Sequence, residues 1–165
     1  MRRAQVNIEF ILSVSIFLLI VSVLSYDILG SLPEFHREAV KDMSISRAYQ
    51  ISEILLRDEG DPKNWDDLEE EIKRIGLSDG RDFFLSDSKI TELNNLCNTD
   101  YQNILKLFGI EKNIMVVNIT NLDGESVVGG IVCSPPIISE TAPKLWIRRF
   151  GILNDKIVKV DVLVY

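Results

Sequence analysis

The chain opens with one uninterrupted run of apolar positions. From Phe10 to Tyr26 no side chain is charged, and the only polar groups are four serines and the terminal tyrosine. At a rise of about 1.5 Å per residue a helix through these positions is about 26 Å long, and extension to Leu29 brings it near the hydrocarbon thickness of a bilayer. Such a helix satisfies its backbone hydrogen bonds internally, as lipid requires. The pattern predicts a transmembrane helix over residues 5–29.

Polar positions then appear, but the helical spacing continues. Apolar residues beyond the run recur at steps of mostly three and four, which is the pattern of an amphipathic helix. Gly30 and Pro33 interrupt it, and because proline clashes with the preceding turn we expect a kink where the chain leaves the membrane. The segment from Asp58 to Pro62 carries the glycine and proline that commonly end helices. We therefore expect an amphipathic stalk helix over residues 30–59.

Shorter helical patterns follow. One helix is expected from Asn64 to Gly76, a second from Ser86 or Ser88, and a third from Thr99. Each carries apolar residues that need a covering sheet. The two tryptophans, Trp65 and Trp146, are expected in the core.

From Ile114 the helical spacing gives way to β-branched runs. Turn-forming residues at 121–124 and 154–155 favour antiparallel hairpins between neighbouring runs. The predicted fold class is therefore α+β, with a long N-terminal helix, short helices and a C-terminal four-stranded antiparallel sheet in a head domain of residues 60–165. The four expected strands are Ile114–Thr120, Ser126–Cys133, Lys144–Leu153 and Lys156–Tyr165.

Charge sets the expected orientation. Arg2 and Arg3 precede the apolar helix, whereas Asp27 and Glu34 follow it, so the positive-inside tendency leaves the N-terminus cytoplasmic. The net charge of −7 is opposite in sign to a nucleic-acid-binding surface. We expect a single-pass protein of the cytoplasmic membrane that contacts lipid, binds no nucleic acid and holds its C-terminal domain outside.

The residues before the apolar run form an ordered motif. Arg2, Arg3 and Ala4 lead into Gln5, and Glu9 follows four residues later at the edge of the run. This order resembles the processing site of archaeal type IV pilin-like proteins with a class III signal peptide. The resemblance implies that a prepilin peptidase cuts between Ala4 and Gln5, so that residues 1–4 are a leader peptide and the apolar helix stays on the product.

The resemblance also implies a role in assembly. In that family the glutamate at this place meets the terminal amine of a neighbouring subunit, so a charge that is costly in lipid becomes paired. The implied partners of Glu9 are other pilin subunits, and the implied function is a structural subunit, minor or accessory, of an archaeal surface filament. Further positions resemble head domains of archaeal pilin-like surface proteins: Gly60–Trp65, the pair Gly76-Leu77, Leu85–Lys89, Tyr101 and the pair Gly109-Ile110.

Other interpretations of the N-terminus remain open. Glu9 also fits an interfacial residue whose carboxylate reaches water. The run from Phe10 to Leu24 fits the apolar region of a secretory signal peptide that is cut near Ser25. An uncleaved signal anchor would leave a membrane-anchored extracytoplasmic binding domain that does not polymerise.

Two modifications are expected in an outward-facing head. Cys97 and Cys133 are the only cysteines, and an even pair in an oxidising compartment favours a disulfide. Two buried free thiols are the alternative. Asn118 begins the sequon Asn-Ile-Thr and is a candidate glycosylation site, although it falls in an expected strand.

Catalytic and metal-binding patterns are missing from the sequence. The single histidine, His36, lies beside Arg37 and Glu38 on the expected stalk helix, without a nucleophile motif near it. The glycines do not form a phosphate-binding loop, and the acidic residues lack EF-hand spacing. We predict no enzymatic activity, no cofactor and no metal site.

Overall fold

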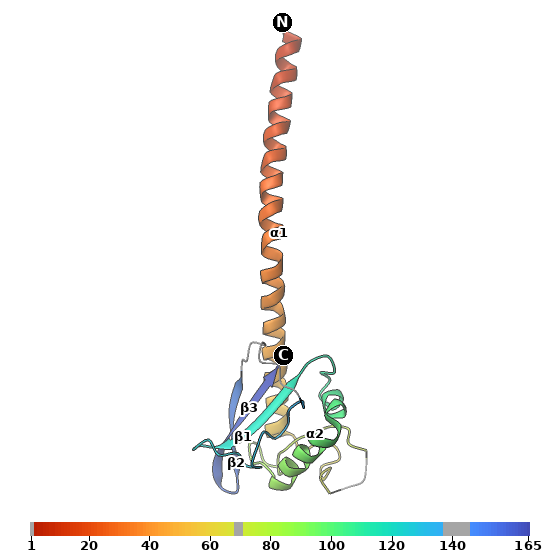
Figure 1. Ribbon diagram of the computed structural model, residues 1–165, viewed down its shortest axis with the longest axis vertical. Coiled ribbons are helices and arrows are strands. Elements are labelled where there is room, and N and C mark those ends of the chain that lie inside the picture. Colours follow the sequence, from red (N-terminus) through yellow and green to blue (C-terminus); the bar gives the residue numbers. More distant parts are fainter. Residues whose placement is uncertain (1, 68–70, 137–145) are drawn as a thin grey trace. The chain divides into compact units, whose positions relative to one another are not determined.

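The computed structural model describes residues 2–67, 71–136 and 146–165, with side chains from Ile8 onward. It divides the chain into two compact units, Met1–Lys41 and Asp42–Tyr165. Helix α1 (Arg2–Arg57) runs through both units. The second unit also contains α2 and all three strands (Figure 1): α2 (Asp87–Leu107), β1 (Met115–Asn121), β2 (Ile147–Leu153) and β3 (Lys156–Val164).

Helix α1 confirms the long N-terminal helix. It remains helical through Gly30 and Pro33, so these two residues do not end the helix, as expected for a stalk that continues from the apolar run. Proline removes only one backbone donor, and the bonds of the adjacent turns keep the backbone helical. The helix ends at Arg57, and Gly60 follows with a φ of +94°, in agreement with the predicted stop.

The helix predicted from Asn64 does not form in the described residues. Pro62 to Asp67 make turns, and Leu68 lies outside the described residues. The backbone N–H of Asp61 donates to Arg74 O at 2.9 Å, and the N–H groups of Lys73 and Arg74 donate back to Asp61 O. The chain reverses between Asp61 and Arg74. The N–H groups of Lys73 and Arg74 therefore bond to Asp61 O instead of to carbonyls of a helix.

The second and third predicted helices are joined in α2. The element contains one break in its helical dihedrals, at Asp100 (φ −143°, ψ 71°). The Asp100 carboxylate accepts a hydrogen bond from the backbone N–H of Asn103 at 3.1 Å, as a helix cap does. The Thr99 hydroxyl instead donates back to Asn95 O. Asp100, and not the predicted Thr99, caps the second half.

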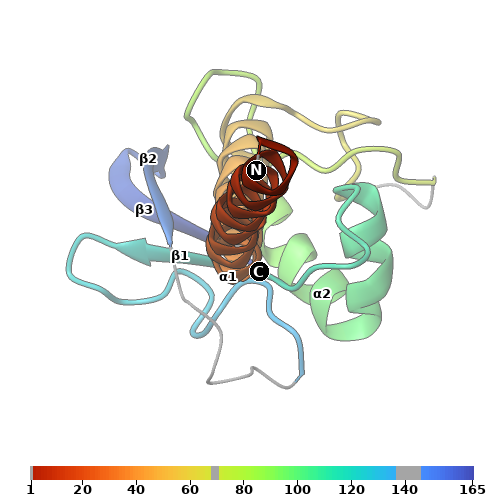
Figure 2. The same ribbon diagram turned by 90° about the horizontal axis from the view of Figure 1, so that it is seen from above.

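The sheet has three antiparallel strands in the order β1-β3-β2 (Figure 2). Asn154 and Asp155 both have positive φ and close the β2–β3 hairpin as predicted. The prediction of four strands is wrong, because Ser126–Cys133 forms only isolated bridges to β1. The Ser126 hydroxyl bonds both the backbone N–H and the carbonyl of Gly130, which closes a turn inside the expected strand. Lys144, the predicted start of another strand, lies outside the described residues.

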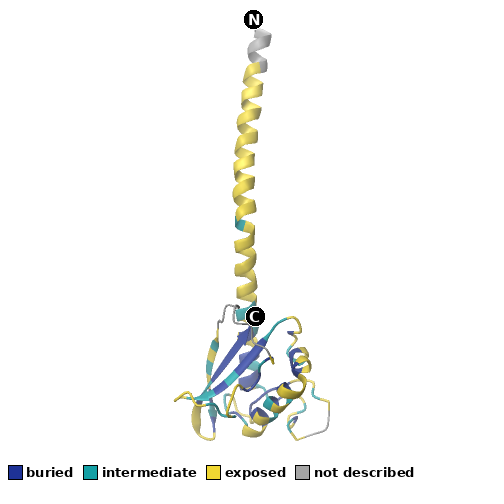
Figure 3. Ribbon diagram, viewed as in Figure 1, coloured by how far each residue is buried: buried dark blue, intermediate teal, exposed yellow. Residues whose placement is uncertain are grey.

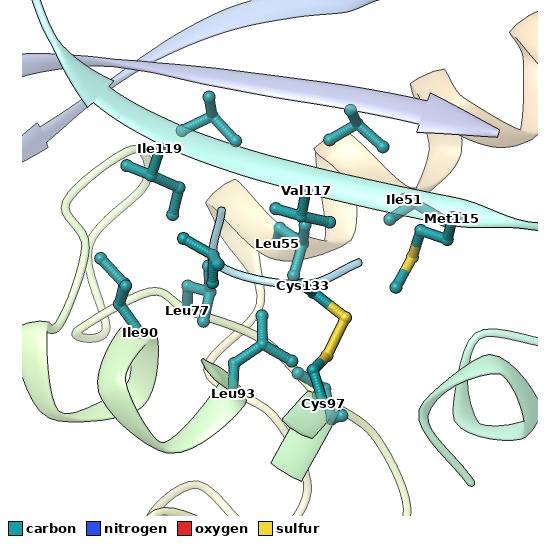
Figure 4. Close-up of a cluster of buried hydrophobic side chains, with 14 of the residues drawn as sticks. Ile51, Leu55, Leu77, Ile90, Leu93, Cys97, Met115, Val117, Ile119 and Cys133 are labelled. Atoms are coloured by element: carbon teal, nitrogen blue, oxygen red, sulfur yellow. A yellow bond between two sulfur atoms is a disulfide. The ribbon is translucent and has the colours of Figure 1, made fainter. Parts of the chain in front are cut away.

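The core of the second unit lies between the sheet and the two helices (Figures 3 and 4). Trp65 is buried as predicted, whereas Trp146 is 39% exposed, so its predicted core position is wrong. The sulfur atoms of Cys97 and Cys133 lie at bonding distance and form the expected disulfide, with Cα atoms 5.3 Å apart. The bridge joins α2 to the segment beside β1. Core side chains drawn in Figure 4 include Ile51, Leu55, Leu77, Ile90, Leu93, Met115, Val117 and Ile119.

Candidate processing and assembly site

The residues of the motif lie on the first turns of α1. Ala4 and Gln5 have helical backbone, and their side chains fall outside the described residues. Glu9 is exposed and stands one helical turn beyond Gln5. The predicted cleavage position and the predicted assembly residue therefore share one helix end.

The apolar run of α1 exposes its side chains on every side. No residue from Ile8 to Gly30 is buried in the structure (Figure 3), and Phe10 and Leu19 are 69% and 65% exposed. The Ser22 hydroxyl donates to Leu18 O at 2.7 Å, so this polar group is satisfied inside the helix. Among the described residues one helix is long and apolar enough to be a membrane span or a signal anchor.

Exposed apolar residues continue on α1 beyond Leu29. Leu32, Phe35, Val40 and Met43 are each at least half exposed. Their spacing places them on one side of the helix. An exposed apolar stripe of this kind is typical of a surface that packs against protein.

In the second unit, the segments around Gly60, Gly76 and Lys89 meet at one loop. Gly60 lies against the Trp65 ring, and the indole Nε1 donates to Gly76 O at 2.9 Å. Lys89 is only 6% exposed, and its ammonium donates to Glu59 O at 2.7 Å and to Ser78 O at 3.0 Å. Burial lowers the pKa of Lys89, and the surrounding carboxylates oppose that shift. The cluster fixes the loop between the two helices.

Sequence reasoning missed the anchoring role of Lys89. One signal was present, because Lys89 precedes Leu93 by four residues and so shares the apolar face of α2. A lysine at such a position must satisfy its ammonium inside the fold. The partners are two loop carbonyls, and nothing in the sequence identifies them.

The other predicted site residues lie apart from this cluster. Asn118 is half-buried in β1, opposite Asp161, whose carboxylate pairs with Arg148 at 2.7 Å. His36 is exposed on α1. In the described part of the chain no three His, Cys, Asp or Glu side chains are grouped to hold a metal ion. Two of the loop acids pair with arginines instead: Asp58 with Arg74 at 2.6 Å and Asp79 with Arg81 at 2.5 Å.

A pH dependence is expected from the ion pair that joins α1 to β2. The Arg149 guanidinium lies 2.6 Å from Glu53, and its hydrogen bond holds the pKa of Glu53 below the ordinary 4.5. A lowered carboxyl pKa contributes stability that is complete above the unfolded-state pKa and lost as pH falls through the folded-state value. We expect the free energy of unfolding to fall below pH 4.5, with a smaller slope in Glu53→Gln. Urea titrations between about pH 5 and 2 measure the free energy of unfolding at each pH. An identical dependence of that free energy on pH in both proteins would contradict the expectation.

Comparison with models of known protein families, with curated proteins and with solved structures gave no match. The long apolar N-terminal helix and the C-terminal antiparallel sheet are compatible with a pilin-like fold.

Proposed function

We propose that the chain is a structural subunit, minor or accessory, of an archaeal type IV pilus-like filament. A prepilin peptidase removes residues 1–4, and α1 then assembles with other pilin subunits. The observation that carries the proposal concerns Glu9. This exposed acid directly precedes an apolar helix whose side chains are exposed on all sides. No catalytic activity forms part of the proposal.

Cleavage before Gln5 would supply the positive charge that pairs with Glu9. A carboxylate near the bilayer centre costs on the order of 3 kcal/mol on insertion scales, and less near the interface. Cutting before Gln5 creates an ammonium one helical turn from Glu9. In the assembled state, the ammonium of a neighbouring copy neutralises the Glu9 carboxylate. Pairing thus favours the assembled state over the isolated helix.

The apolar stripe beyond the membrane supports the same conclusion. Leu32, Phe35, Val40 and Met43 are exposed where water would otherwise meet them. Full burial of one such side chain contributes roughly 1.5 to 3 kcal/mol. Packing of α1 against other copies covers the stripe, whereas a solitary anchor leaves it exposed.

Mass spectrometry of the native N-terminus tests the processing step. Protein purified from its own membranes is expected to begin at Gln5. A chain that begins at Met1 would indicate the membrane-anchored binding domain that does not polymerise. A chain that begins near Tyr26 would indicate a secreted domain, and either result overturns the proposal.

The assembly step is tested by Glu9→Ala. Membrane insertion should be unchanged or improved, because a charge is removed from the apolar run. The fraction of protein recovered in filaments should fall about tenfold or more, since the partner amine is left unpaired. Sheared filaments and membranes are compared by immunoblot. Asp27→Ala, at the other end of the run, is the matched control, and equal incorporation of the two variants would count against the pairing.

A further inference from the structure

The Cys97–Cys133 disulfide is enclosed by the core of the second unit. Cys97 is 5% exposed on the buried face of α2, and Cys133 is 1% exposed beside β1. Figure 4 shows the bridge between these two elements, with Leu93 and Val117 next to it. Protein interiors are packed as densely as organic crystals, so a second molecule does not fit against either sulfur. While the core is closed, the bridge is out of reach of reagents in solution.

The chemistry that makes a disulfide needs access to a sulfur. A thiolate attacks the disulfide of an oxidant, and the resulting mixed disulfide holds the oxidant on the chain until a second thiolate displaces it. Structural cysteines that are buried do not react in this way. The bridge must therefore be made in a form of the second unit in which at least one of the two sulfurs is uncovered.

The contacts around Cys133 indicate which part of the chain opens. Its backbone N–H donates to Val117 O at 3.0 Å, and its carbonyl accepts from Val117 N at 2.8 Å. The side-chain amide of Asn94, on α2, donates to the carbonyls of Ile131 and Val132 at 3.2 and 2.9 Å. These four hydrogen bonds fasten a short stretch of chain to β1 and α2, and that stretch carries one of the two sulfurs.

This stretch, Ile131–Cys133, is held less firmly than the strands, and we call it the closing segment. Within the described residues it joins β1 by one isolated bridge, between Cys133 and Val117, whereas β1 pairs with β3 at seven successive positions. Gly129 and Gly130 precede it, and a β-carbon at either glycine would meet no atom within 4 Å. Local opening occurs first where few backbone bonds hold the chain. We therefore expect the closing segment to leave β1 while β1 and β3 stay paired.

We propose that a disulfide oxidant makes the bridge while the closing segment is detached from β1, and that seating of the segment then encloses the bridge. One chain thiolate attacks the disulfide of the oxidant and releases one oxidant thiol. The other chain thiolate attacks the mixed disulfide and releases the second. The chain loses two electrons and two protons, and the two sulfurs of the oxidant gain them. The oxidant is thus a transient partner of the open form alone.

This inference goes beyond the proposed function, because it concerns maturation of the second unit. It does not depend on cleavage before Gln5 or on assembly through α1. None of the rates below changes with the position at which the chain begins, so the inference and the proposed function fail separately.

Reduction of the native protein tests the need for opening, because exchange in either direction passes through the same mixed disulfide. The oxidised full-length chain in detergent is treated with dithiothreitol, with and without urea. Free thiols are trapped with a maleimide and counted by mass spectrometry. We expect reduction in buffer to be on the order of a hundredfold slower than in urea that unfolds the second unit. Equal rates would show that the closed form already admits reagents, and the inference would fail.

Asn94→Ala loosens the closing segment and leaves both cysteines in place. It removes the bonds to the carbonyls of Ile131 and Val132. We expect its bridge to be reduced in buffer roughly fivefold to tenfold faster than in the wild type, because opening becomes more frequent. Asn103→Ala, which changes an exposed asparagine of the same helix, is the matched control and should keep the wild-type rate. Equal rates for the two variants would mean that the closing segment does not control access to the bridge.

The order of the two steps is tested from the reduced side. The chain is reduced in urea and diluted into buffer, and oxidised glutathione is added either at once or after tryptophan fluorescence shows that the second unit has folded. We expect the bridge to form at least about tenfold more slowly after the delay. A rate that does not depend on the delay would overturn the proposed order.

Discussion

Gly76→Ala is expected to lower the free energy of unfolding of the head by about 3 kcal/mol or more. A β-carbon at this position would lie 2.0 Å from Asp58 O and 2.8 Å from Gly60 N. Both are backbone atoms, so a side-chain rotation does not relieve the overlap. The loop would have to move, and the Trp65 bond to Gly76 O would be disturbed with it.

Gly130→Ala is the matched control for this substitution. A β-carbon at Gly130 meets no atom within 4 Å, and the residue does not require positive φ. Its unfolding free energy should stay within about 1 kcal/mol of the wild type. Urea unfolding of the full chain in detergent, followed by tryptophan fluorescence, compares them. Equal stability of the two variants would mean that the close approach of Asp58 to Gly76 is not needed for folding.

Removal of the disulfide is expected to cost about 3 to 4 kcal/mol. Cys97 and Cys133 are 36 residues apart, and a cross-link over that separation restricts the unfolded chain. Both residues are buried, so alanine at the two positions keeps the site apolar while it removes the bridge. The double variant Cys97→Ala with Cys133→Ala should therefore unfold at a lower urea concentration.

The wild-type protein supplies the control for the disulfide. Once unfolded and reduced, it should refold with a stability close to that of the double variant. A non-reducing gel shows the state of the bridge before each measurement. If the reduced and oxidised proteins unfold at the same urea concentration, the bridge does not contribute to stability.

Features encoded by local pattern were predictable from the sequence. The apolar run and the spacing after it give α1, and Asn154-Asp155 gives the β2–β3 hairpin. The segment Ser126–Cys133 misled because β-branched residues suggested a strand, while the Ser126 hydroxyl closes a turn onto Gly130. The Asn64 pattern misled because the backbone N–H groups of Lys73 and Arg74, inside the predicted helix, donate to Asp61 O. Both errors arise where a contact between separated residues outweighs propensity.

One candidate site was predictable from the sequence and the other was not. The order of Ala4, Gln5 and Glu9 is visible in the sequence because all three lie within two turns of one helix. The hydrogen bonds from the Lys89 ammonium reach Glu59 O and Ser78 O, which lie 30 and 11 positions away in the chain. No periodicity brings those groups together, so only the folded chain identifies them.

Helix α1 belongs to both units, so the position of a proteolytic cut decides which fragment keeps the end of the helix. Ile51, Leu55 and Leu56 lie in the core of the second unit and are at most 2% exposed, although they belong to the helix that carries the apolar run. A protease that cuts before Asp42 would leave these three residues on the C-terminal fragment. A cut between Arg57 and Trp65 would remove them and leave the core of the second unit incomplete.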